Sequence, residues 1–176
     1  METEYDFKAG TYDIAKHEAG HWLCAMALGW EPRSIHIMVP EHANGHYGYA
    51  LTSRREHLQS LEDVRFYAMN RVKVLYAGVN AQHFNGSVFD GDSIRADMSR
   101  GGANTDFLKA EEIYFFYYNC LSNPKGWEDE FHPLILDVQL LIRMNYDFIL
   151  AVANRMMAMA SAPGEEILLT GGELTS

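Results

Sequence analysis

Residues 15–29 read AKHEAGHWLCAMALG, and this stretch decides how the rest of the chain is interpreted. His17 and His21 are four residues apart, which on a helix places both side chains on one face, with about 5–6 Å between their Cβ atoms. Two imidazoles at that spacing can bind a single Zn²⁺. Glu18 projects about 100° further round the helix, where a general base would stand beside the metal without binding it. The H-E-x-x-H spacing therefore predicts a zinc site with Glu18 as the catalytic residue.

A catalytic zinc site usually takes a third protein ligand and leaves the fourth position to water. The extended metzincin motif cannot supply that ligand, because Cys24 and Ala27 stand where it needs glycine and histidine. No downstream E-x-x-x-D pattern supplies a glutamate either. Side-chain chemistry alone leaves seven candidates: His83, Asp90, Asp92, Asp97, Asp106, Glu111 and Glu112.

The hydrophobic pattern on either side predicts a mainly helical domain with one small antiparallel sheet, an α+β class. Its expected helices span about 12–28, capped by Thr11 or Asp13, about 60–84, capped by Ser60 and broken near Gly78, about 105–121 and about 131–160. A hairpin is expected over about 34–52, with strands 34–39 and 47–52 around Asn44-Gly45. The glycine-rich stretch 85–103 is expected to be a loop, and the last residues a short helical turn. The 176 residues suit a single domain, 1–176, with 1–10 as an N-terminal tail.

Composition argues against several partners. With 14 basic and 24 acidic residues the net charge is −10, so the chain would repel phosphate backbones and no nucleic acid partner is expected. The apolar region 133–153 is interrupted by charged and polar residues, so no membrane span is expected, and METEYDFKAG at the start does not resemble a signal peptide. These features favour a cytoplasmic protein. Cys24 and Cys120 lie in apolar stretches and are expected to be reduced thiols of the core.

The quoted stretch resembles the zinc helix of the FtsH protease family, peptidase family M41. GGANTDFLKAEEI, residues 101–113, is similar to that family's second signature, a G-A-x-x-D-L stretch that opens a helix. Weaker similarities to family segments lie in residues 45–52, 74–84 and 169–174. The resemblance implies a zincin-like FtsH peptidase-domain helical fold, zinc metalloendopeptidase activity, and Asp106 as the third zinc ligand beside His17 and His21.

The departures from this family bear on the substrate. The chain has no G-x-x-x-x-G-K-[ST] phosphate loop and no ATPase domain, and Gln82 and His83 replace two acidic residues of the family pattern. ATP-driven unfolding is therefore not expected within this chain. The predicted substrate is a flexible or unfolded polypeptide, unless a separate ATPase or adaptor chain assists. The hexamers of the family make a homo-oligomer a further expectation.

Substrate peptide is expected to lie extended along strand 34–39 or strand 47–52 by strand addition. Two alternatives stay open: a non-catalytic or regulatory zinc-binding or protein-interaction module that retains the peptidase fold, and hydrolysis of a non-peptide amide. Retention of Glu18 argues against the first, because binding does not need a base. No functional role is expected for the remaining histidines and methionines. We expect exposed turn or strand positions for His36, His42 and His46, and a helix surface for His83. Core or partner contact is expected for Met156, Met157 and Met159.

Overall fold

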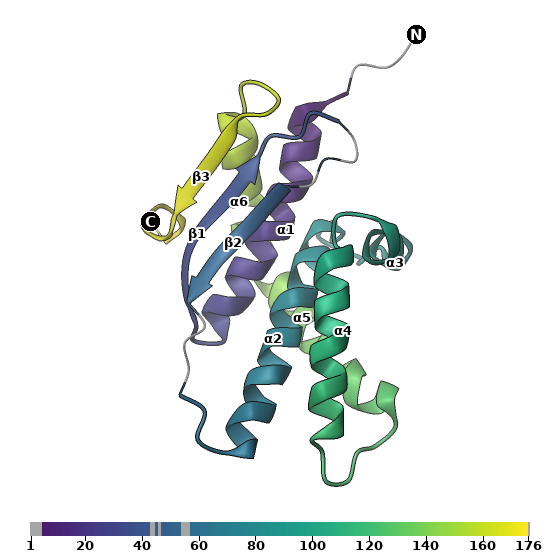
Figure 1. Cartoon of the computed structure of the whole chain (residues 1–176). Coiled ribbons are helices and arrows are strands. Elements are labelled where there is room, and N and C mark those ends of the chain that lie inside the picture. Colours follow the sequence, from purple (N-terminus) through teal and green to yellow (C-terminus); the bar gives the residue numbers. More distant parts are fainter. Residues whose placement is uncertain (1–4, 43–44, 46, 54–56, 176) are drawn as a thin grey trace.

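A computed structural model describes residues 5–42, 45, 47–53 and 57–175. Seven helices and three strands follow one another in this part of the chain (Figure 1): α1 (Phe7–Ala27), β1 (Glu31–Met38), β2 (Tyr47–Ser53), α2 (Leu61–Gln82), α3 (Gly91–Arg100), α4 (Asn104–Asn119), α5 (Trp127–Met144), α6 (Tyr146–Met159), β3 (Glu166–Thr170) and α7 (Gly171–Leu174). The predicted class, mainly helical with a small antiparallel sheet, is confirmed.

Helix α1 is the central element of the fold. The sheet and α6 pack against it, and α2 packs against another side, so that its residues are buried almost continuously from Ile14 to Ala25 (Figure 1). Its predicted start was wrong. The Asp6 carboxylate accepts hydrogen bonds from the N–H groups of Lys8 and Ala9, so the helix begins at Phe7 and residues 7–10 are not a tail.

The sheet has the strand order β2-β1-β3, with both pairings antiparallel. The predicted hairpin is confirmed in its two strands, whereas Asn44 of its turn lies outside the described residues. Strand β3 was not predicted, although the helical turn after it was and forms α7. Among the described residues β1 is paired on both sides, so β2 and β3 are the edge strands, and of these two β2 packs against α1.

Three further boundaries differ from the prediction. Helix α2 begins at the predicted cap Ser60, which forms a capping box with Asp63, but it runs through Gly78 without a break. The expected loop 85–103 contains α3, because the Asp90 carboxylate caps a helix there. The long last helix is two helices, α5 and α6, separated at Asn145, whose φ of −123° and ψ of 26° interrupt the helical path.

Two hydrophobic clusters share α2. One joins α1, the sheet and α6, and the other joins α2, α4 and α5. Both thiols are free as predicted, and Cys24 belongs to the first cluster, whereas Cys120 is only partly buried and its predicted place in the core was wrong. Within the described residues, no helix combines the length and the apolar composition needed to cross a membrane. The shared helix fixes the start of α4 close to the middle of α1, where the candidate site lies.

Candidate metal centre

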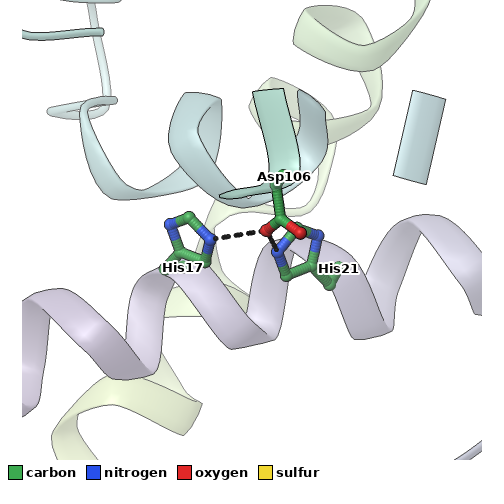
Figure 2. Close-up of side chains that lie close together, drawn as sticks. All are labelled: His17, His21 and Asp106. Atoms are coloured by element: carbon green, nitrogen blue, oxygen red, sulfur yellow. Dashed lines mark hydrogen bonds and ion pairs between the residues drawn. The ribbon is translucent and has the colours of Figure 1, made fainter. Parts of the chain in front are cut away.

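The three predicted ligands meet at one point between α1 and α4. His17 and His21 project from one face of α1, and Asp106, in the first turn of α4, points at them (Figure 2). The Asp106 Oδ2 atom is 2.9 Å from His21 Nε2 and 3.4 Å from His17 Nε2. Taking one ligand atom from each side chain, all three atoms lie within 4.8 Å of one another. Two imidazole nitrogens and one carboxylate oxygen form a donor set that Zn²⁺ accepts, with its fourth position left open.

Each histidine is oriented by a partner on α2. The Nδ1 atom of His21 donates to the backbone carbonyl of Val74 at 2.6 Å, and Nδ1 of His17 donates to Oε1 of Gln82 at 2.9 Å. A carbonyl oxygen only accepts, so both Nδ1 atoms carry the hydrogen. In the neutral rings the lone pairs are then on the two Nε2 atoms, which face Asp106. Such outer hydrogen bonds are the usual support of metal-binding imidazoles.

This arrangement requires a cation or a proton between the side chains. The Nε2 lone pair of neutral His21 and the Asp106 carboxylate are both acceptors, and they would repel each other at 2.9 Å. Burial disfavours the charged imidazolium, but the hydrogen bond and the charge of Asp106 outweigh it and raise the pKa of His21. Burial likewise opposes ionisation of Asp106, yet the two histidines hold the pKa of its carboxyl well below the usual range. The residues therefore fit a bound metal ion, which would take the place of the proton.

Two glycines bring the elements close enough for this geometry. A Cβ atom on residue 78 would lie 2.5 Å from His21 Nε2 and 2.6 Å from His17 Nε2, so Gly78 leaves the room in which the two ring edges lie. A Cβ atom on Gly20 would lie 2.5 Å from the carbonyl oxygen of Ala77, which is backbone and cannot move aside. Both glycines thus serve a close approach of α1 and α2, and neither has a positive φ.

Glu18 lies between the metal centre and the sheet. Its side chain is buried, and the nearby backbone N–H of Ala50 in β2 acts to lower the pKa of its carboxyl group. A Cβ atom on Gly48 would lie 2.9 Å from Glu18 Oε1, so this strand also approaches the carboxyl closely. Burial raises the pKa of Glu18, although the nearby histidines counteract it. A carboxyl group with a raised pKa beside an open edge strand suits a general base.

A cavity of about 360 Å³ opens at these residues. Residues of α1, α2, α4 and β2 line it, among them His17, Glu18, His21 and Asp106. Two basic side chains in its wall, Arg71 of α2 and Lys109 of α4, were not among the predicted site residues. A sequence signal existed for Lys109, because it follows Asp106 by three residues on the same helix.

The other candidate ligands lie elsewhere. His83 is partly buried at the end of α2, and its Nε2 atom is 3.0 Å from Oδ2 of Asp97. Asp90 caps α3, and Asp92 pairs with Arg95 on that helix. Glu111 and Glu112 are exposed on α4, away from the cavity.

The expectations for the remaining histidines and methionines were correct only in part, since His83, expected on a helix surface, is partly buried. His42 is exposed, whereas His46 lies outside the described residues. His36 is not an exposed strand residue as predicted, because it stacks on Tyr49 with ring centroids 4.5 Å apart and is partly buried. Met156 is in the core, one of the two predicted roles of these methionines, whereas Met159 is exposed.

Neither a comparison with protein-family models nor a search of curated proteins gives a match to this chain. The likeness of its motifs to the FtsH proteases therefore stays a prediction, and the function must be argued from the geometry of the site.

Proposed function

We propose that the chain is a zinc-dependent metallopeptidase that hydrolyses peptide bonds in flexible or unfolded polypeptides. The observation that carries this proposal is the convergence of His17, His21 and Asp106, with Glu18 held beside them at the wall of one cavity. The motif resemblance to FtsH-type peptidases of family M41 supports the same reaction.

The site residues would have different roles in the reaction. His17, His21 and Asp106 would hold Zn²⁺, which when bound supplies Lewis-acid chemistry that acidifies water and polarises a carbonyl group. Glu18 would accept the proton of the attacking water and pass it to the leaving amine. Gln82 and the Val74 carbonyl would keep the two imidazoles in the binding tautomer, because each accepts from an Nδ1–H group.

The peptide would add to the sheet at β2. Strand β1 was the other predicted site for the substrate, and this alternative is wrong because Ser34–Met38 of β1 pair with β2 on one side and with β3 on the other. Residues 48–50 and 52 of β2 line the cavity, so an added strand would pass beside Glu18. A substrate segment must be extended before it can pair with the edge of a sheet, which favours substrates without stable structure.

Zinc content and cleavage together test the proposal. Purified wild type should contain about one zinc per chain by elemental analysis and should cleave casein or a peptide library. Asp106→Ala should lose most of the metal. Glu18→Gln should keep the metal and lose turnover by about a hundredfold or more, because proton transfer by a positioned base contributes about 10²–10⁴.

Glu111→Gln is the matched control for both variants, since Glu111 is an exposed glutamate of α4 outside the cavity. It should keep zinc and activity. Full zinc in Asp106→Ala would exclude this residue as a ligand, and cleavage by Glu18→Gln at the wild-type rate would contradict the mechanism. Bound zinc without cleavage of any peptide would favour the binding module, and cleavage of small amides alone would favour an amidase.

A further inference from the structure

The cavity at the metal centre contains two basic side chains for which the proposed reaction has no use. Arg71 and Lys109 line the same cavity as the three candidate ligands. Lys109 is exposed and, within the part of the chain that the structure describes, makes no ion pair, whereas Arg71 also interacts within the protein. The whole chain has a net charge of −10, so two basic side chains in one cavity are opposite in sign to the net charge of the protein.

Both charges lie close to the place of the reaction. Lys109 follows Asp106 by three residues on α4, and Arg71 precedes Val74 by three residues on α2. Each is thus about one helical turn, roughly 5 Å, from a residue that forms or orients the metal centre. An extended peptide advances about 3.3 Å per residue, so the basic groups would meet a substrate group within about two residues of the cleaved bond.

Within the described residues, neither acidic side chain of the same wall forms an ion pair with Lys109. Among the described lining residues the acidic ones are Glu18 and Asp106. Asp106 would face the metal ion, and Glu18 is buried against β2. Lys109 can therefore donate charge-assisted hydrogen bonds to a carboxylate that enters this part of the cavity.

We propose that Lys109, with Arg71 beside it, selects substrates that carry a carboxylate near the cleaved bond. This carboxylate is either the side chain of an aspartate or glutamate or the C-terminal carboxylate of the peptide. The inference rests on the proposed function, because it names the substrate class of the same site. Lys109 is the residue on which it depends, and Arg71 adds positive charge to the same wall.

A cleavage assay tests the preference. A neutral peptide that the protein cleaves is mapped by mass spectrometry, and matched peptides then carry Glu or Gln at each of the two positions on either side of the bond. A further pair ends in a free carboxylate or an amide, which separates the two sources of the charge. We expect kcat/KM to be about tenfold or more higher for at least one carboxylate peptide than for its neutral match, as charge-assisted hydrogen bonds imply.

Variants assign that preference to the basic residues. Lys109→Met should reduce the ratio between the carboxylate and neutral peptides, and Lys109→Glu should invert it. Arg71→Met is a second variant that should lower the same ratio. Lys8→Met is the matched control, since Lys8 is an exposed lysine on α1, ten residues before Glu18, and it should leave the ratio unchanged.

A binding measurement separates this inference from the proposed activity. Zinc-loaded Glu18→Gln protein is titrated with the same labelled peptides by fluorescence anisotropy. Tighter binding of the carboxylate peptides without any cleavage by the wild type would overturn the peptidase activity but support the carboxylate preference. Equal cleavage of charged and neutral peptides, unchanged in Lys109→Met, would overturn the preference and leave the activity standing, and absence of both binding and cleavage would overturn both.

Discussion

At the scale of the residue, the orientation of the candidate ligands depends on neighbouring atoms that are not themselves candidate ligands. The two histidine rings are set by an amide and a carbonyl group of α2, and they have room only because residue 78 has no side chain. The amide Gln82 stands where the resembled family has an acidic residue, and as a neutral acceptor it fixes the same tautomer of His17. The proposed metal binding would thus depend on the α1–α2 contact as much as on the ligands.

We expect Gly78→Ala to disrupt metal binding. The added methyl group would lie 2.5 Å and 2.6 Å from the two Nε2 atoms, so the rings must turn away from Asp106. Zinc affinity, measured by competition with a chelator, should fall by about tenfold or more, as it does when the supports of a site are lost. Gly172→Ala is the control, because a Cβ atom there meets nothing within 4 Å. Equal zinc affinity in the two variants would show that the rings do not need this space.

Part of the site was readable from the sequence. The spacing of His17, Glu18 and His21 places them together on any helix, and this needed no knowledge of the fold. Asp106 could be singled out from seven candidates only by resemblance, because its approach to α1 depends on how α4 packs on α2. Arg71 and the space at Gly78 were missed, since both matter only through neighbours distant in the sequence.

At the scale of the element, the contact between α1 and α2 sets the position of every ligand support. The helices approach closely at Gly20, where a Cβ atom would lie 2.6 Å from the Cβ atom of Ala81 and closer still to the Ala77 carbonyl oxygen. The backbone of α2 cannot move here without also moving Val74 and Gln82, which accept hydrogen bonds from the two histidine rings.

Gly20→Ala should therefore lower both stability and zinc affinity. Overpacking of a tight contact costs about 1–3 kcal/mol, and we expect a loss of this size in the free energy of unfolding, measured with urea on metal-free protein. The better helix propensity of alanine offsets up to about 1 kcal/mol of it. Gly172→Ala again provides the comparison. Unchanged stability in Gly20→Ala would mean that the helices separate easily at this point.

The elements themselves were predicted unevenly, for physical reasons. Helix α2, which has a clear cap at Ser60, was predicted within two residues at either end. Helix α3 was missed because its glycines and aspartates are typical of loops, whereas here Asp90 caps it and Arg100 ends it. Strand β3 has only five residues, and its place beside β1 depends on a pairing across most of the chain.

At the scale of the whole molecule, ionisation at the centre links stability to pH. In the metal-free protein the pKa of Asp106 is lowered, so its contribution to stability is present above about pH 3.9, its unfolded value, and is lost as pH falls through the folded value. The pKa of His21 is raised, so its contribution is present below about pH 6.5 and is lost as pH rises through the higher folded value. The raised pKa of buried Glu18 adds to the loss on the alkaline side.

We therefore expect metal-free protein to have a lower Tm at pH 8 than at pH 5, measured with a chelator present. Added zinc should reduce this difference, because the metal competes with the proton on His21 and binds more tightly as pH rises. Asp106→Asn, which removes the charge that raises the pKa of His21, should show a smaller difference than wild type. A Tm that is equal at the two pH values in metal-free wild type would contradict the assignment of this pair.

The ligands also join distant parts of the chain, since His17 and Asp106 are 89 residues apart. A metal held by both would act as a cross-link that closes this length of chain, and the unfolded polypeptide would have no equivalent for it. Free zinc at 100 times its Kd would add about 2.7 kcal/mol to the free energy of unfolding, by mass action alone. The fraction of molecules open to proteolysis, and hence the lifetime of the protein in a cell, would then follow the supply of zinc.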